Sequence, residues 1–310
     1  MATAIIGNIT FDKLYNVDKL PQDSYVAKVI SNSTHFGGRA ANIAVALGKL
    51  GCSPLLFGVA GKDFVELGYA DELRRNNVDV TNIRIFEEEL TAEYLSITAP
   101  NDKSIAFFTP NSEGPHYDSY LASFENFSGF TQVCLAKLGE NKVTENFIKK
   151  FKSRAETSLI VALGPDIRRA SASLCQAICS TADLLIMNNF EAKVLSNKLE
   201  LNSSSELANW RPNDGVTIVT RGKQGSTLLM GSTRKEEFPP WPVSSEMFKN
   251  DLGAGDAFVA GYIYGLQKGL GEEGAIQFAS LVSSYAIRSI SAQPELPSGV
   301  SLLKILKKNL

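Results

Sequence analysis

The residues best suited to chemistry lie near the end of the chain, in the segment 249–268. Three small residues, Gly253, Ala254 and Gly255, precede an apolar run with helical spacing. The backbone N–H groups in the first turn of a helix have no partner within that helix, so such a loop predicts an anion-binding site. Asp256 lies in that first turn, where the helix dipole alone would favour a carboxylate. The same carboxylate could take a proton from a hydroxyl group while the loop holds a phosphate.

These glycines fit neither of the two commonest nucleotide-binding motifs. The dinucleotide fingerprint G-x-G-x-x-G would require glycine where Phe258 stands, and it normally follows the first strand of its domain. No G-x-x-x-x-G-K-[ST] motif occurs in the chain, which excludes a P-loop. A nicotinamide-dependent oxidoreductase is therefore a weak alternative.

Two segments nevertheless carry a family resemblance. Residues 253–256 match the core of D-T-x-G-A-G-D, the C-terminal signature of the ribokinase-like (PfkB) carbohydrate kinases, although Asn250 and Asp251 replace its usual Asp and Thr. The run GGRAAN at residues 37–42, before an amphipathic helix, resembles the N-terminal signature G-G-x-x-x-N. With both signatures in the expected order, the chain is identified as a member of this family. Arg39, inside the second signature, could face solvent or reach a ligand.

The resemblance implies a role for each matching residue. Asp256 would be the catalytic base, and Gly253, Ala254 and Gly255 would donate N–H groups to the transferred phosphoryl group. The residues implied to bind the acceptor, with the glycine pair also acting as a hinge for closure, are Asp12, Gly37, Gly38 and Asn42. Those implied to bind the nucleotide, with Glu191 positioning magnesium, are Asn188, Thr220, Gly222 and Gly225.

Some of these residues also have simple structural interpretations. Asp12 could be a turn residue just past the end of a buried strand at residues 2–9, although ligands bind at that end of the strands in open α/β sheets. Asn188 and Glu191 have the spacing of a helix capping box. The glycines after Thr220 are also typical of a plain hairpin.

Alternating elements are expected to position these side chains. Strands and helices are predicted in turn at 131–136, 143–155, 158–163, 168–180 and 183–187. Such alternation with short connections indicates a mostly parallel sheet covered by helices on both faces. We therefore expect a three-layer α/β/α fold of the ribokinase-like type, with residues 1–310 forming a single domain.

Two segments of the first half, at about 12–34 and 88–110, alternate weakly and flank turn signals such as Pro100-Asn101-Asp102. They are expected to form a small β-sheet that projects from the main body. This matches the lid with which the family covers its substrate. The resemblance also leaves room for a homodimer formed through the lid.

Composition restricts the class of protein further. The formal net charge of −2 gives no electrostatic basis for binding nucleic acid or an anionic membrane. The sequence lacks an apolar run of about 18 residues, so no transmembrane helix is expected. The four cysteines lack a metal-binding spacing, and we expect reduced thiols in a cytoplasmic protein.

The activity implied by the resemblance is transfer of the γ-phosphate of ATP, with Mg²⁺, to a primary hydroxyl of a sugar. A nucleoside is the alternative acceptor, because Phe36, Phe107 and Phe108 could form an aromatic shelf for its base. A catalytically silent sugar- or nucleotide-binding relative is a second alternative. Such a relative would be expected to lose the carboxylate of Asp256, which is retained.

Potassium is a doubtful cofactor. Many members of the family are stimulated by K⁺ through a loop beside the anion site. Here Asn250 replaces the usual Asp, and Ser291 replaces the usual Gly of the later G-A-Q turn. Because a hard cation prefers charge-dense oxygen ligands, we expect weak activation by K⁺.

Overall fold

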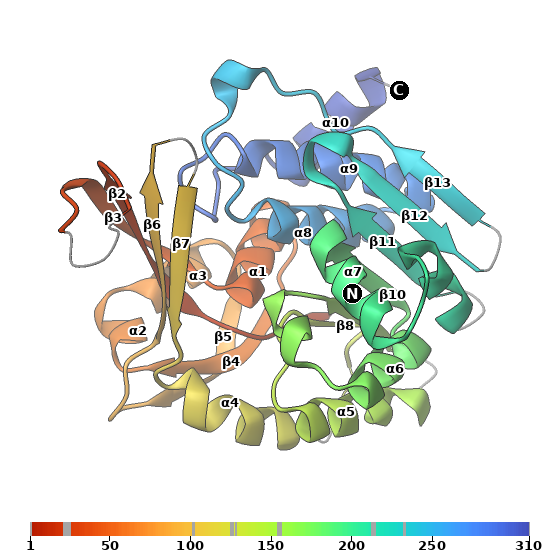
Figure 1. Ribbon diagram of the computed structural model, residues 1–310, viewed down its shortest axis with the longest axis horizontal. Helices are drawn as coiled ribbons and strands as arrows, with labels where there is room; N and C mark the ends of the chain where they lie inside the picture. The colour runs from red at the N-terminus through yellow and green to blue at the C-terminus, as the bar shows by residue number, and fades with distance from the viewer. Residues whose placement is uncertain are drawn as a thin grey trace.

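A large sheet runs through the centre of the protein in the computed structural model (Figure 1). The structure describes residues 2–20, 26–100, 103–124, 127, 129–153, 157–211, 215–231 and 234–309. Within these residues the sheet has nine strands in the order β13-β12-β11-β10-β9-β8-β1-β4-β5. Their bounds are β1 Thr3–Ile6, β4 Leu55–Gly61, β5 Asp79–Phe86, β8 Gln132–Leu135, β9 Ser158–Ala162, β10 Leu184–Asn188, β11 Val216–Thr220, β12 Ser226–Met230 and β13 Arg234–Phe238. Neighbouring strands are parallel except for β12, which is antiparallel to both β11 and β13.

Helices cover both faces of this sheet (Figure 1). Those packed on one face are α1 Arg39–Lys49, α2 Asp63–Glu66, α3 Tyr69–Arg75, α8 Ala254–Gln267, α9 Gly271–Ala286 and α10 Gly299–Asn309. Those on the other face are α4 Glu113–Ala122, α5 Asn141–Lys149, α6 Ala172–Thr181 and α7 Asn189–Lys198. Short 3-10 helices span Lys150–Ser153, Pro165–Arg169, Ser204–Trp210, Gly222–Gln224 and Ser245–Met247. Among the described helices, none is long and apolar enough to cross a membrane.

Strand alternation explains the two hydrophobic cores. Ile5 of β1 and Cys134 of β8 are buried in the core beneath α1, α8 and α9. Their chain neighbours Ile6 and Leu135 point to the opposite face and enter the core beneath α4 to α7. Strands that are apolar on both sides are typical of a parallel sheet buried between two helical layers. The three-layer fold predicted from the sequence is confirmed.

A second, smaller sheet stands beside the main body, formed by the red and yellow strands in Figure 1. Its order is β3-β2-β6-β7, with bounds β2 Thr10–Val17, β3 Val29–Gly37, β6 Ala92–Ala99 and β7 Lys103–Thr109. Of the segments expected for the lid, residues 21–25 and 101–102 lie outside the described residues. The sequence suggested that Asp12 directly follows the first strand, but in the structure it does not. The chain leaves the large sheet after Ile6, and Asp12 lies inside β2.

Candidate active site

The small-residue loop forms the N-terminus of α8. Gly253 is the N-cap with a φ of 75°, a conformation that glycine adopts without steric cost. In the described part of the chain, the backbone N–H groups of Gly253, Gly255 and Asp256 have no hydrogen-bond partner. Ala254 differs from the expectation, because its N–H donates to the carbonyl of Asp251 at 3.2 Å. A Cβ built on Gly255 would meet no atom within 4 Å, so the space above this turn is open to a ligand.

Two side chains of α1 hold the Asp256 carboxylate. Asn42 Nδ2 donates to Oδ2 at 2.9 Å, and Arg39 Nε lies 3.3 Å from Oδ1. The Arg39 guanidinium also donates to the carbonyls of Ala136 at 3.2 Å and Leu163 at 2.5 Å, just beyond the ends of β8 and β9. Arg39 therefore reaches the candidate base, an arrangement that the sequence did not suggest, and its side chain stays 26% exposed.

The site contains two buried carboxyl groups whose pKa values are raised, those of Asp256 and Asp12. Burial raises the pKa of Asp256, and the Arg39 guanidinium and the Asn42 amide oppose that rise. Burial also raises the pKa of Asp12 to about 7, with a further contribution from the charge of Asp256. The Thr10 hydroxyl, which donates to Asp12 Oδ1 at 2.6 Å, acts in the opposite direction. Carboxyl groups perturbed in this way beside an anion loop are typical of sites that transfer protons.

The glycine pair at the end of β3 allows close approach on the same side. A Cβ on Gly37 would lie 2.1 Å from Asp12 Oδ2, so only glycine lets this carboxylate lie there. Gly38 is the N-cap of α1 with a φ of 95°, and a Cβ there would lie 2.6 Å from the carbonyl oxygen of Asn8. The structure thus brings Asp12 and both glycines beside the helix that carries Asn42.

Neighbouring strands β10 and β11 carry the residues expected to bind the nucleotide. Asn188 and Thr220 are the last residues of these strands and are register partners. Asn188 and Glu191 form a capping box, in which Asn188 Oδ1 accepts the Glu191 N–H at 2.9 Å and Glu191 Oε2 accepts the Asn188 N–H at 2.8 Å. Gly222 has a φ of 54° with open space where a side chain would be, and Gly225 has a φ of 80°.

Glu191 connects this nucleotide side to the candidate base. Burial raises the pKa of Glu191, the Arg39 guanidinium lowers it, and the charges of Asp256 and Asp166 raise it further. These three charged groups are therefore near enough to Glu191 for their fields to act on it.

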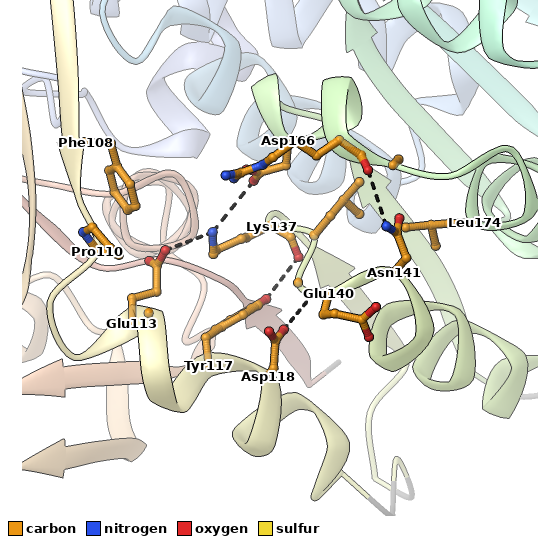
Figure 2. A pocket seen from close by; sticks show the side chains of 15 residues that line it. Phe108, Pro110, Glu113, Tyr117, Asp118, Lys137, Glu140, Asn141, Asp166 and Leu174 are labelled. Carbon is orange, nitrogen blue, oxygen red and sulfur yellow. Dashed lines mark hydrogen bonds and ion pairs between the residues drawn. The ribbon is translucent and has the colours of Figure 1, made fainter.

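A cavity of about 500 Å³ lies between α4, the start of α5 and β7 (Figure 2). Lys137 projects into it, with Nζ 2.8 Å from Glu113 Oε1 and 3.8 Å from Asp166 Oδ2. The ring centres of Phe108 on β7 and Tyr117 on α4 lie 5.7 Å and 5.4 Å from this ammonium group. Lys137 directly follows Ala136, the residue just beyond β8 whose carbonyl binds the Arg39 guanidinium.

The register of the small sheet places three side chains in one row. Asp12 pairs with Tyr94, and Tyr94 pairs with Phe108. Side chains of directly opposed residues lie on the same face of a sheet. Burial raises the pKa of Tyr94, and the Asp12 carboxylate adds to that rise, in agreement with this register. The row therefore leads from Asp12, beside the candidate base, to the cavity that contains Lys137.

The other two residues considered for an aromatic shelf lie elsewhere. Phe36 stacks on Tyr69 with ring centres 4.3 Å apart and packs against the core beneath α1. Phe107 is the chain neighbour of Phe108 and so faces the opposite side of the small sheet. Of the three, Phe108 alone lines the cavity.

Sequence reasoning missed Tyr94 and Lys137 as residues of this region, and it found the turn that carries Gln293 only as a family resemblance. Lys137 follows a buried strand, and a charged residue at the carboxyl end of a strand is a signal that could have identified it. Tyr94 could be placed only with the register of the small sheet. The side-chain amide of Gln293 lies 3.2 Å from Asn42, a contact across most of the chain that local patterns do not reveal.

Comparison with known proteins agrees with this architecture. The model of the pfkB family carbohydrate kinases matches residues 3–299. The nucleoside kinase of Methanocaldococcus jannaschii is 26% identical over 306 residues, which cover 98% of this chain and 96% of that protein. The ribokinase of Bacillus subtilis is 25% identical over 294 residues, which cover 95% of each protein.

Solved structures show the same fold. The crystal structure of the M. jannaschii nucleoside kinase has a TM-score of 0.86 at 24% identity, covering 99% of this chain and 98% of that one. The Burkholderia thailandensis nucleoside kinase in complex with inosine has a TM-score of 0.84 at 21% identity, with coverage of 99% and 98%. A structure of the same protein in complex with ADP-inosine has a TM-score of 0.79 at 20% identity, with coverage of 99% and 95%.

These findings define a kinase that acts on a small molecule. The chain belongs to the pfkB family of carbohydrate kinases, whose members phosphorylate sugars or nucleosides.

Proposed function

We propose that this kinase transfers the γ-phosphoryl group of ATP to the primary hydroxyl of a nucleoside, with Asp256 as general base. The observation that carries the proposal is the position of the Asp256 carboxylate. It lies at the N-terminus of α8 beside free N–H groups, held by Asn42 and Arg39. The complexes of a relative with inosine and with ADP-inosine support a nucleoside and an adenine nucleotide as ligands.

The residues divide the reaction between proton removal and charge stabilisation. Asp256 accepts the hydroxyl proton while the hydroxyl oxygen bonds to the γ-phosphorus and the bond to the β-phosphate oxygen breaks, which releases ADP. The N–H groups of Gly253 and Gly255 face the charge on the transferred group. Arg39 and Asn42 favour the ionised form of Asp256, which is the form that accepts a proton. Positioning and charge neutralisation of this kind are what phosphoryl transfer requires.

The remaining predicted residues surround the two ligands in this proposal. Asp12, with Gly37 and Gly38, holds the acceptor on the side of the small sheet. On the other side, the nucleotide lies over the ends of β10 and β11, where its proposed partners are Asn188, Thr220, Gly222 and Gly225. The acceptor hydroxyl and the γ-phosphate then meet at Asp256.

We further propose Mg²⁺ as the metal cofactor, positioned by Glu191 through water. Mg²⁺ keeps several waters and usually takes one or two carboxylates together with substrate phosphates. Within the described residues, no three His, Cys, Asp or Glu side chains form a metal cage. Glu191 uses Oε2 in its capping box, which leaves Oε1 for a water ligand. These residues fit a metal held mainly by the nucleotide, where it would neutralise phosphate charge.

The aromatic row favours a nucleoside over a free sugar. Tyr94 and Phe108 lie on the face of the small sheet that carries Asp12, and Phe108 lines the cavity beyond. A ribose held at Asp12 would direct its base along this row. Aromatic side chains are the usual platforms on which bases stack.

The charges in the cavity disfavour an acceptor that already carries a phosphate. Lys137 pairs with Glu113 at 2.8 Å, and Arg169 pairs with Asp166 at 2.9 Å. Both cations of the lining are therefore already neutralised by carboxylates. A phosphate group already present on the acceptor would have to displace these carboxylates from Lys137 and Arg169, whereas a neutral base would not.

The test is ADP release from Mg-ATP with a panel of ribose, fructose, adenosine, inosine and cytidine. We expect turnover with at least one nucleoside at a higher kcat/KM than with either sugar. Preference for ribose without nucleoside turnover would contradict the proposed acceptor, and a panel without any turnover would revive the silent-relative alternative.

Phe108→Ala sharpens the test of the acceptor. Loss of base stacking should raise KM for the nucleoside about tenfold with little change in KM for ATP. Phe107→Ala is the matched control, because that ring lies on the opposite face of the same strand. Sedimentation of both variants separates an effect on assembly from an effect on binding. Equal changes of KM in the two variants would contradict the row as a base-binding surface.

We also propose a homodimer formed through the outer face of the small sheet. On this face Leu95 pairs with Phe107, and Ile97 pairs with Tyr15 and Ile105. Phe107 is 54% exposed and Ile105 is 40% exposed, and contiguous exposed apolar side chains are typical of interaction surfaces. A monomeric wild-type protein in sedimentation velocity would contradict this proposal.

The four free cysteines support our placement of the enzyme in a reducing cytoplasm.

A further inference from the structure

A chain of hydrogen bonds links the candidate base to the end of β3 in the small sheet. The Tyr69 hydroxyl lies 2.7 Å from the carbonyl oxygen of Gly37. Gln293 Nε2 lies 2.8 Å from the Tyr69 hydroxyl and 3.2 Å from Asn42 Oδ1. Asn42 Nδ2 completes the chain, because it donates to Asp256 Oδ2 at 2.9 Å.

The donors and acceptors in this chain can run in one direction only. A carbonyl can only accept, so the single hydroxyl hydrogen of Tyr69 is used at Gly37. The Tyr69 oxygen must then accept from Gln293, which turns the NH₂ group of Gln293 toward both Tyr69 and Asn42. Asn42 must therefore present its oxygen to Gln293 and its NH₂ group to Asp256. The two ends of an amide have similar shapes, so its hydrogen-bond partners decide which way it faces.

Tyr69 provides a fixed starting point for this order. Its side chain is fully buried, stacked on Phe36 at 4.3 Å and in tilted contact with Phe64 at 5.5 Å and Phe11 at 5.8 Å. An aromatic ring enclosed on several sides has few alternative positions. The hydroxyl that orders the chain is therefore held in place by the core.

The turn that carries Gln293 packs against the loop expected to bind phosphate. Its backbone N–H donates to Ser291 Oγ at 3.2 Å. The preceding residue, Ala292, packs so closely on the N-cap of α8 that a Cβ on Gly253 would lie 2.5 Å from the Ala292 carbonyl oxygen. The turn that carries Gln293 and the loop expected to bind phosphate thus touch each other.

We propose that Gln293 and Tyr69 are positioning residues, which hold Asn42 with its NH₂ group toward Asp256 and tie this orientation to the position of Gly37. The inference rests on the proposed role of Asp256 as base. With Asn42 reversed, an amide oxygen would face the carboxylate, and the repulsion would favour the protonated form of Asp256. A protonated base cannot accept the hydroxyl proton, so the order of the chain controls kcat. Movement of the small sheet at Gly37 would be transmitted to the base by the same bonds.

The test compares two substitutions of similar size at one position. Gln293→Glu introduces a carboxylate that can only accept, so Asn42 must reverse to donate to it. We expect kcat to fall roughly thirtyfold, the scale of a lost hydrogen bond to a charged group, with KM for ATP unchanged. Gln293→Met removes the amide without imposing the opposite order. We expect that variant to lose about fivefold in kcat.

A double-mutant cycle with Asp256→Asn distinguishes positioning from a general structural role. If Gln293 acts through Asp256, then Gln293→Glu should change kcat by less than about threefold in the Asp256→Asn background. Tyr69→Phe provides a second test of the same hydrogen-bond chain if Gln293→Glu fails to fold. It should lower kcat about fivefold in the wild-type background and have no effect beside Asp256→Asn.

The proposal is supported if Gln293→Glu and Gln293→Met lower kcat by different factors in the wild-type background and if both effects disappear in the Asp256→Asn background. Equal losses, or losses that multiply with that of Asp256→Asn, overturn it and leave Gln293 a structural residue. Near-normal kcat for Asp256→Asn alone would instead refute Asp256 as base, which is a failure of the proposed function.

Discussion

Replacement of Arg39 by glutamine tests whether the ion pair keeps the candidate base ionised. Arg39 Nε lies 3.3 Å from Asp256 Oδ1, and the two side chains are 26% and 9% exposed. Two unit charges at this distance attract by about 1 kcal/mol in water and by about 5 kcal/mol at an effective dielectric constant of about 20. Because about 1.4 kcal/mol corresponds to one pKa unit, even the smaller of these energies means that removal of the guanidinium should raise the pKa of Asp256 by about one unit.

The assay is the pH profile of kcat/KM. Asp256 accepts a proton only in its ionised form, so the rate falls as pH drops through its pKa. Burial already raises that pKa, and the Arg39→Gln substitution raises it further. The acidic limb of the profile should therefore move up by at least about one pH unit, with the rate recovering at alkaline pH.

Two variants sharpen this measurement. Arg39→Lys cannot reproduce the forked contacts to the carbonyls of Ala136 and Leu163. Because it keeps the positive charge, its acidic limb should shift less than that of Arg39→Gln. Burial gives Asp12 a pKa of about 7, and an Asp12→Asn background removes that second titration. An acidic limb at the same pH in Arg39→Gln and wild type would refute the electrostatic role of Arg39.

The other predictions concern stability, cations and closure. Asp12→Asn should raise Tm more at pH 8 than at pH 4. The folded protein holds Asp12 neutral up to a pKa of about 7, so the stability contributed by neutral Asp12 is lost as pH rises from about 4 through 7. Equal gains at both pH values in calorimetry would contradict this. K⁺ should raise initial rates less than about threefold over Na⁺ or tetramethylammonium, because the neutral Asn250 amide donates to the Ser289 carbonyl at 3.0 Å and brings no charged oxygen to the loop. A tenfold effect would show that the loop retains a cation site. Acceptor binding should protect the amides of 29–37 and 92–99 from hydrogen exchange, as expected for closure over the substrate, and unchanged protection would count against a mobile lid.

The layered fold was predictable because its signals are local. Alternating strands and helices after residue 131, and a small-residue loop before an apolar helix, depend on near neighbours in the chain. The same is true of the capping box, because Asn188 and Glu191 are three residues apart and their bonds close within one helical turn. Asp12 shows the limit of this reasoning. The sequence indicated a strand before it, but could not show that a second strand, belonging to another sheet, begins at Thr10.

The contacts that complete the site are long-range and were not predictable. Arg39 reaches Asp256 because strands β8 and β9 place carbonyls on either side of its guanidinium, and local patterns do not encode that spacing. Tyr94 required the pairing of β2 with β6, since alternation shows which residues share a face but not which face turns inward. The Gln293 turn was visible as a family resemblance, but its contact with Asn42 follows only from the packing of the turn on the anion loop.

The most direct test of the central claim is single-turnover phosphorylation by Asp256→Asn with Mg-ATP and the best acceptor from the panel. The substitution preserves the size of the side chain and removes its ability to accept a proton. We predict that the rate of phosphoryl transfer falls at least about a hundredfold, the scale of general-base loss, while the Kd for ATP stays within about twofold of wild type. A transfer rate near that of wild type, in a protein with an unchanged circular dichroism spectrum and Tm, would contradict the assignment of Asp256 as the base.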